Sequence, residues 1–234
     1  MKRYLKQTAM LDYSSAPIQR LIRQRKWKSL GEFERIKAIY DFVRDEVLFG
    51  YNISDNVCAT KVLTDGFGQC NTKGTLFMAL LRACGIPCRV HGFCIDKKLQ
   101  KGAMTGFVYN NAPREIFHSW VEVWFDGRWY ELEGFILDKR YLNKLQKKFS
   151  GCKGAFCGYG VAVKDFRHPV IDFDCSDTYI QSEGIVRDFG VYDSPDELLK
   201  EHGQDLSGFK EFLFRNLGRH LMNRNVKKIR DMKI

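Results

Sequence analysis

A β-hairpin signal constrains this chain more than any other part of its sequence. Residues 118–125 (HSWVEVWF) and 129–135 (WYELEGF) flank Asp126-Gly127, and Asp-Gly is a dipeptide favoured in two-residue hairpin turns. Side chains alternate between the two faces of each strand, so one face of such a hairpin must be buried against another layer. The segment therefore predicts an antiparallel sheet that packs against helices.

Apolar residues at helical spacing predict helices ahead of this hairpin, over residues 16–27, 32–47 and 70–83. The last of these is followed by Gly85 and Pro87, which are helix-stop signals. Residues 49–68 carry scattered Asn, Asp and Gly and are predicted to be a loop, whereas 88–95 (CRVHGFCI) is predicted to be a strand. Helices followed by mainly antiparallel strands are typical of the α+β class.

The length of 234 residues fits one domain, alone or with an appended segment. We expect residues 1–193 to form this domain, with its core at about residues 32–140. Residues 151–193 are interrupted by glycines and are expected to supply strands and loops that complete the sheet. A Pro-Asp-Glu start signal after Ser194 predicts a basic helical segment over 194–234, packed on the same domain or extending from it.

The sequence gives no signal for a membrane span or for secretion. No run approaches the roughly 18 apolar residues of a span, and no apolar segment follows the basic N-terminus. We therefore expect a soluble, cytoplasmic protein with no membrane partner, whose eight cysteines are thiols rather than disulfides. Cys152 and Cys157 lie near His168, but zinc needs a second well-spaced ligand pair, so no metal site is expected.

Cys70 lies at the predicted start of the helix over 70–83. The unpaired N–H groups and the dipole of a helix favour a negatively charged sulfur at that position. The preceding Gly66 and Gly68 allow a bend that brings the backbone close to a substrate carbonyl, where the Cys70 N–H would stabilise an oxyanion. A cysteine at a helix start is more often structural than catalytic, so the assignment depends on its partners.

The register of the hairpin nominates these partners. A two-residue turn puts His118 and Glu133 on one face as diagonal neighbours, about 7 Å apart at the backbone. The pattern therefore favours Glu133 as the carboxylate that orients His118. The same register places Glu122 opposite Glu131, a repulsion that requires solvent or a neighbouring Lys or Arg. A slip of one residue would separate His118 from Glu133 altogether.

With these residues the sequence resembles the transglutaminase-like superfamily, which includes eukaryotic transglutaminases and peptide N-glycanases. The matching segments, specific over about residues 32–140, are GQC at 68–70 leading into KGTLFMALLRACGIPCRV, and HSWVEV at 118–123 followed by DGRW at 126–129. The resemblance implies a papain-like α+β fold with a Cys, His, acid triad. Cys70 then corresponds to the nucleophile and His118 to the general base. Glu133 takes the place of the acid, where the family more often has Asp.

The mechanism that this resemblance implies has two steps. His118 assists formation of the Cys70 thiolate, which attacks an amide carbonyl and expels ammonia or an amine. An amine or water then completes the reaction while His118 transfers the proton. Gln69 or Trp120 is a candidate for the second oxyanion donor. Lys73, in the first helical turn, is interpreted as an exposed lysine, and no metal or organic cofactor is required.

Three functions follow from these residues. The first is transamidation of a glutaminyl group in a peptide or protein, with an amine as acceptor. The second is hydrolysis by a protease, an amidase or a deglycosylating enzyme, with water as acceptor. The third is a non-catalytic module that binds polyanions, which an intact Cys, His and acid set disfavours. The sequence does not separate the first two, because the outcome depends on whether an amine or water reaches the thioester.

The charge of the chain bears on the third function. Thirty-eight Lys and Arg against 28 Asp and Glu give a formal net charge of +10, with the excess at the two ends. Such ends attract nucleic acid, anionic lipid or acidic substrates, but no nucleic-acid-binding motif accompanies them, and we interpret them as solvated helix faces. If they bind polyanions, truncation after about Asn216 should weaken that binding and leave the reactivity of Cys70 intact.

Overall fold

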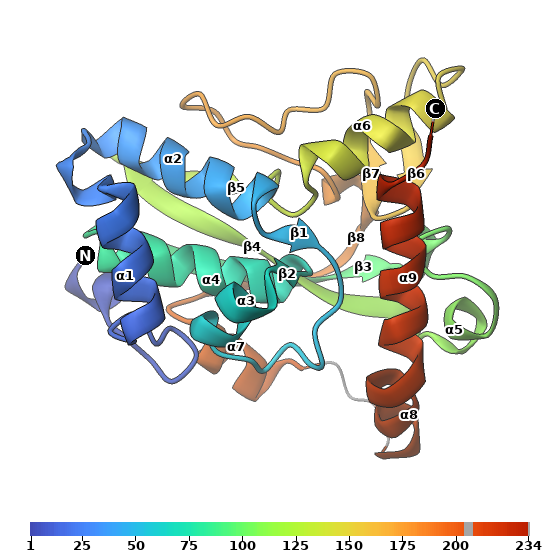
Figure 1. Ribbon diagram of the computed structural model, residues 1–234, viewed down its shortest axis with the longest axis horizontal. Coiled ribbons are helices and arrows are strands. Elements are labelled where there is room, and N and C mark those ends of the chain that lie inside the picture. The colour runs from blue at the N-terminus through green and yellow to red at the C-terminus, as the bar shows by residue number, and fades with distance from the viewer. Residues whose placement is uncertain (204–207, 234) are drawn as a thin grey trace.

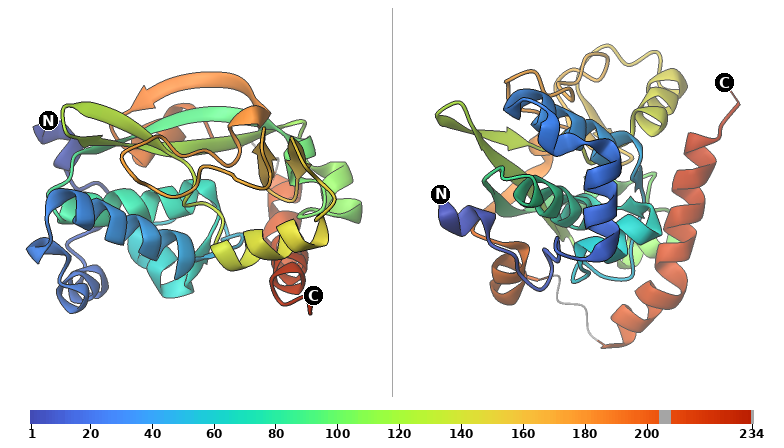
Figure 2. Two further views of the ribbon diagram at one scale, coloured as in Figure 1. Left: turned by 90° about the horizontal axis from the view of Figure 1, so that it is seen from above. Right: turned by 60° about the vertical axis from the view of Figure 1, so that its left-hand side comes forward.

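The computed structural model describes residues 1–203 and 208–233. Residues 204–207 and 234, which fall within the predicted C-terminal segment, lie outside the described residues. The architecture is α+β, as predicted: an antiparallel sheet forms one layer and helices form a second layer beside it (Figures 1 and 2).

The main sheet has four strands in the order β5-β4-β3-β8, and all neighbours are antiparallel. Its strands are β3 (Cys88–Asp96), β4 (Glu115–Phe125), β5 (Arg128–Leu132) and β8 (Ile185–Tyr192). The hairpin of β4 and β5 has the predicted register, with Glu122 opposite Glu131. Asp126 (φ 47°) and Gly127 (φ 81°) both adopt the left-handed conformation that a tight hairpin turn needs. The second strand is shorter than predicted, so Glu133 lies just beyond its end.

The helices predicted before the hairpin are present as α1 (Ala16–Arg25), α2 (Glu32–Asp45) and α4 (Cys70–Ala83). The prediction that residues 49–68 form only a loop is wrong. They contain α3 (Ala59–Asp65), and the short strands β1 (Leu48–Phe49) and β2 (Phe67–Gly68) pair in parallel. A seven-residue helix is too short to show a helical period in the sequence, and a two-residue strand shows none at all.

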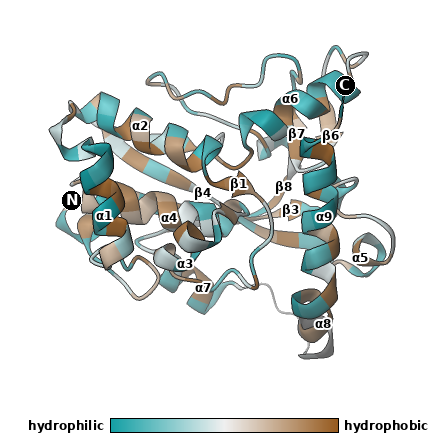
Figure 3. Ribbon diagram, in the orientation of Figure 1, coloured by the Kyte–Doolittle hydropathy of each residue, from teal (hydrophilic) through white to brown (hydrophobic). Residues whose placement is uncertain are grey.

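Helix α4 occupies the centre of the helical layer. It packs against α2 and β4, and Figure 3 shows the apolar residues gathered along it and along β3 and β4. The prediction that Lys73 is exposed is wrong, because its side chain is fully buried in this position. Its Nζ donates hydrogen bonds to the carbonyl oxygens of Arg44 (3.1 Å) and Ile136 (2.9 Å), which replace the water that an exposed ammonium would bind.

Smaller elements lie on both sides of the hairpin in the chain. Before it comes α5 (Gly106–Asn111), and after it come α6 (Lys139–Lys148), β6 (Phe156–Gly158), β7 (Val161–Val163) and α7 (Pro195–Glu201). Within 151–193, only β8 extends the main sheet, whereas β6 and β7 form a separate two-stranded ladder. Ser194 caps α7 through a hydrogen bond from the Glu197 N–H to its hydroxyl, in agreement with the predicted start signal.

The C-terminal helices are α8 (Gly208–Leu213), a π-helical stretch (Phe214–Gly218) and α9 (Arg219–Arg230). Helix α9 packs against α6 and, in Figure 1, runs along one side of the molecule with α5 and α8 near its start. None of the helices in the described part of the chain is long and apolar enough to cross a membrane.

Candidate active site

Cys70 is the first residue of α4, and its position is fixed by the residues around it. Gln69 is the N-cap, and its backbone N–H donates to the Thr72 hydroxyl (3.0 Å) as part of a reciprocal capping box. Cys70 itself is half-buried and lines a cleft. The sulfur therefore lies at the positive end of a 14-residue helix and is open to a substrate, as the sequence predicted.

His118 lies on β4 and is fully buried, as is Glu133. Their side chains meet as predicted, with His118 Nε2 2.8 Å from Glu133 Oε1. The other ring nitrogen, Nδ1, is buried and has no hydrogen-bond partner among the residues that the structure describes. It is therefore the nitrogen available to Cys70, whose sulfur interacts electrostatically with the ring.

These contacts decide the charge of the imidazole. Burial by itself would lower the pKa of His118, but the neighbouring Cys70 and the hydrogen-bonded carboxylate of Glu133 raise that pKa to about 10. His118 is consequently an imidazolium at neutral pH, between a sulfur and a carboxylate. An imidazole that holds a proton beside a cysteine sulfur can donate that proton during a reaction.

Glu133 is itself held by the backbone of a distant loop. Its Oε2 accepts hydrogen bonds from the N–H groups of Ile180 (2.7 Å) and Gln181 (2.8 Å). Its own N–H donates to the carbonyl oxygen of Thr178 (2.9 Å). Because Oε2 is occupied in this way, Oε1 is left to face His118. Sequence reasoning missed this loop, and no pattern would have indicated it, since every residue except proline carries a backbone N–H.

The two candidate oxyanion donors have different positions. Gln69 lies beside Cys70 in the cleft, but its carboxamide accepts from the Asn52 N–H (2.9 Å) and donates to Asp55 Oδ1 (2.9 Å). Trp120 is buried against Phe93 and is not among the described residues that line the cleft. The structure therefore brings Gln69 to the nucleophile and leaves Trp120 in a second apolar cluster with Phe93 and Ile95.

Three further polar residues surround Cys70, and the sequence did not nominate them. Tyr51 is buried in the cleft and donates to Gln100 Oε1 (2.8 Å), and burial followed by the Cys70 charge raises the pKa of its hydroxyl, which stays protonated. Asn71 accepts from the Ser119 hydroxyl (2.8 Å) and so ties the start of α4 to the strand of His118. Burial raises the pKa of Asp55, whose carboxyl is hydrogen-bonded to Gln69.

The C-terminal helices belong to the same site. The side chain of Asn223, on α9, accepts from the N–H of Tyr51 (2.7 Å) and donates to its carbonyl (2.9 Å). Further along, Arg230 pairs with the buried carboxylate of Asp138 (2.6 Å) and donates to the carbonyl of Phe49 (2.8 Å). These contacts hold α9 next to the cleft, in the part of the chain that truncation after about Asn216 would remove.

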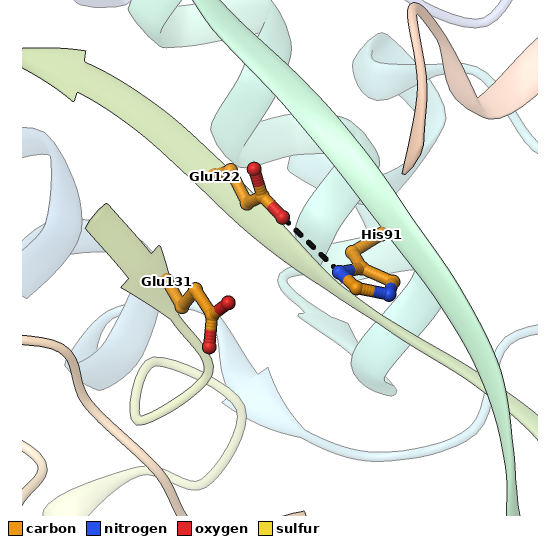
Figure 4. Close-up of side chains that lie close together, drawn as sticks. All are labelled: His91, Glu122 and Glu131. Atoms are coloured by element: carbon orange, nitrogen blue, oxygen red, sulfur yellow. Dashed lines mark hydrogen bonds and ion pairs between the residues drawn. The ribbon is translucent and has the colours of Figure 1, made fainter. Parts of the chain in front are cut away.

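A second polar cluster lies on the hairpin, where Glu122 faces Glu131 (Figure 4). Ligand atoms of His91, Glu122 and Glu131 all lie within 4.8 Å of one another, a spacing that a metal ion would also allow. However, the Glu122 oxygens already contact Arg89 (2.6 Å) and His91 Nδ1 (3.1 Å), and Tyr179 donates to Glu131. The guanidinium supplies the positive charge here, so the donor set fits an ion-pair network better than a metal site.

Comparison with known proteins identifies one family and several similar structures. Residues 20–134 match the model of the transglutaminase-like superfamily. A presumed cysteine protease from Cytophaga hutchinsonii is similar at 16% identity and a TM-score of 0.47, over 83% of this chain and 47% of its own. A presumed protease from Parabacteroides distasonis is similar at 18% identity and a TM-score of 0.35, over 56% of this chain and 24% of its own. Red sea bream transglutaminase is similar at 18% identity and a TM-score of 0.32, over 56% and 25%.

This chain thus spans less than half the length of each of these three structures. No curated protein matches the sequence significantly. The family match includes Cys70 and His118 and ends one residue after Glu133. Residues 20–134 of this chain are therefore a domain of the transglutaminase-like superfamily.

Proposed function

We propose that this protein is a cysteine-nucleophile enzyme that acts on amide bonds of peptides or proteins through a thioester on Cys70. The observation that carries the proposal is the buried hydrogen bond between His118 and Glu133, next to a sulfur at the start of a helix. Removing an imidazolium and a carboxylate from water costs free energy, and titratable groups in such environments are typical of functional sites. Here the pair lies beside the nucleophile.

The first step forms the thioester. The Cys70 thiolate attacks the amide carbon, and the carbonyl oxygen becomes an oxyanion near the Cys70 N–H. The carbon–nitrogen bond then breaks, and His118 donates its proton to the departing nitrogen. A histidine with a pKa of about 10 holds this proton at neutral pH, so it begins the cycle as an acid.

The second step releases the acyl group. An amine or water attacks the thioester, and neutral His118 accepts the proton that the attacking group loses. The carbon–sulfur bond breaks, and the thiolate and imidazolium are restored. Throughout both steps Glu133 keeps the ring oriented through Nε2, so that Nδ1 remains turned to the reacting groups. Transamidation and hydrolysis differ only in which acceptor reaches the thioester.

A panel of glutaminyl peptides, offered with and without a labelled primary amine, tests this function. Intact-mass analysis distinguishes incorporation of the amine, deamidation and cleavage, and detects an acyl adduct on the protein. We expect one of these products with the natural protein and none with Cys70→Ser. The matched control is Cys157→Ser, an exposed cysteine on β6 whose replacement should leave the product unchanged. Equal product from Cys70→Ser and the natural protein would overturn the proposal.

A further inference from the structure

We propose that the cleft beside Cys70 binds a bulky apolar side chain, aromatic or large aliphatic, of the peptide whose amide Cys70 attacks. This inference rests on the proposed function and adds the class of substrate.

The cleft has a volume of about 1120 Å³, which exceeds the space that a single side chain needs, and its lining is mostly apolar. Its interior includes Tyr51, Met104, Phe117 and Met222, all of them buried. Polar groups stand beside the nucleophile, because Gln69, Cys70 and Asn71 are consecutive residues at the start of α4 and all three line the cleft. A ligand therefore fits with its amide beside the nucleophile and its apolar part in the remainder.

The edge of the cleft exposes large apolar side chains to solvent. Phe107 is 63% exposed, Leu217 is 50% exposed and Ile53 is 41% exposed, and all three line the cleft. Phe212 and Leu221, on the same C-terminal helices as Leu217, are also exposed. Apolar side chains that gather around a concave site mark a place where a ligand covers them.

The two sides of this edge come from separate parts of the chain. One side is α5, which carries Phe107, and the other is the C-terminal segment, where Gly218 lies close to Val108 of α5. Figure 1 shows α5 beside the C-terminal helices. The C-terminal wall is anchored by the hydrogen bonds of Asn223 to Tyr51 described above. The C-terminal wall is therefore held in place by specific contacts with the site, although it lies outside the residues that match the family.

The residues that line the cleft also favour a peptide over a polyanion or a carbohydrate as its ligand. A polyanion would need cations along the cleft, but Lys200 and Arg215 are at the exposed edge, and Asp55 lies next to Gln69 near the nucleophile. A carbohydrate would need polar partners along its length, whereas most of the interior is apolar. A peptide supplies both the amide that the polar groups beside Cys70 receive and the side chain that the apolar part receives.

The test compares two alkylating reagents that differ only in an apolar group, iodoacetamide and N-(2-phenylethyl)iodoacetamide. The rate of Cys70 modification by each is followed by peptide mapping, and the ratio of the two rates is divided by the same ratio for free N-acetylcysteine. We expect a normalised ratio of about tenfold in favour of the phenylethyl reagent, the scale of selectivity of an apolar pocket. A normalised ratio near one would overturn the inference.

Substitutions at the edge of the cleft test whether its apolar side chains cause the preference for the phenylethyl reagent. Phe107→Ser and Leu217→Ser should each lower the normalised ratio by about threefold or more. Val170→Ser is the matched control, since Val170 is 55% exposed and does not line the cleft, and it should keep the ratio of the natural protein. An equal loss of ratio in Val170→Ser would count against the cleft as its source.

The alkylation test needs a reactive Cys70 but no turnover, which separates this inference from the proposed function. If the phenylethyl preference is present and no amide substrate reacts, the proposed function fails and the apolar site stands. If amide substrates react but phenylalanine and glycine peptides of otherwise equal sequence react equally well, the proposed function stands and this inference fails.

Discussion

Glu133 contacts His118 with one carboxylate oxygen and the backbone of residues 180–181 with the other. The distances are 2.8 Å from Oε1 to His118 Nε2, and 2.7 and 2.8 Å from Oε2 to the two N–H groups. Both side chains are fully buried, so neither can turn towards water. The two backbone N–H groups therefore fix the orientation of the carboxylate. The carboxylate in turn fixes the imidazole, whose Nδ1 remains available to Cys70.

Replacement of this carboxylate should reduce activity. For Glu133→Gln we expect a loss of roughly 10–10³-fold in turnover, smaller than the about 10⁴-fold loss for the equivalent change in serine enzymes. A thiolate depends less than a serine hydroxyl on the base beside it. The measurement is kcat on whichever amide substrate the peptide panel identifies.

The matched variant is Glu131→Gln, two residues earlier and within β5. Glu131 contacts Tyr179 and not His118, so activity should change by less than about threefold. Circular dichroism must show both variants folded, because an amide at position 133 presents an NH₂ group to a donor. Greater damage from Glu131→Gln than from Glu133→Gln would contradict the assignment of the orienting carboxylate.

The charge of His118 should be visible by NMR. Its ring proton should titrate with a pKa near 10, and the signal is assigned by its absence from His118→Gln. In Cys70→Ser the midpoint should fall well below this value, because the thiolate charge is lost while burial still lowers the pKa. A midpoint near the ordinary value of 6.5 in the natural protein would remove the imidazolium from the mechanism.

The same shift has a consequence for stability. Between about pH 6.5 and 10 the folded protein keeps the His118 proton and the unfolded chain has lost it. The contribution of His118 to the free energy of unfolding is therefore complete below pH 6.5 and is lost as the pH rises towards 10. Denaturant titrations at several pH values should show this contribution decrease in the natural protein and not in His118→Gln.

Lys73 should have the opposite effect on stability. Burial lowers its pKa from 10.5 to about 7, so the unfolded chain binds the proton more tightly and the contribution of Lys73 to stability rises between pH 7 and 10.5. Lys73→Met removes the donor to two buried carbonyls, at a cost of about 1–3 kcal/mol at pH 9 and less at pH 6. The measurement is denaturant unfolding at both pH values.

Lys147→Met is the control for this comparison, since Lys147 is an exposed lysine on α6. Its replacement should change the free energy of unfolding by less than about 0.5 kcal/mol at either pH. Equal loss of stability at pH 6 and pH 9 in Lys73→Met would show that the pKa of Lys73 is not lowered in the folded protein.

The C-terminal helix should contribute to stability through Arg230. Arg230→Met leaves the Asp138 carboxylate buried without its cation, and loss of one partner of a buried ion pair costs about 3–5 kcal/mol. Arg224→Met, an exposed position on the same helix, should cost less than about 0.5 kcal/mol. Equal stability of the two variants in denaturant would show that the pair does not anchor the helix.

Cysteine reactivity should not follow exposure. Cys157 and Cys175 are exposed and Cys70 is half-buried, so a reagent guided by access alone would modify the first two. We expect brief iodoacetamide treatment at about pH 6 to label Cys70 first, because a thiolate reacts and a thiol does not. Although the residue is largely exposed, partial desolvation of its sulfur and the nearby charge of Asp96 raise the pKa of Cys157. Labelling of Cys157 before Cys70, seen by peptide mapping, would argue against a catalytic role for Cys70.

The sequence by itself determined the features that depend on neighbouring residues. The Asp-Gly turn and the alternation of the flanking strands set the register of the hairpin, and the structure has that register. The apolar spacing and the glycine after it set the helix from Cys70 to Ala83, which has the predicted bounds. From these two elements the contact between His118 and Glu133 followed, although Phe135 lies beyond the end of the strand that was predicted to include it.

Only the tertiary structure decided what distant residues do to this site. The N–H groups that hold Glu133 come from residues 180–181, and a backbone donor leaves no mark in a sequence. Lys73 is buried because α4 is covered on every side, which depends on the layers around the helix and not on its own pattern. Likewise Asn223 reaches Tyr51 across 172 positions of chain, so a basic segment that looks solvated in sequence becomes a wall of the cleft.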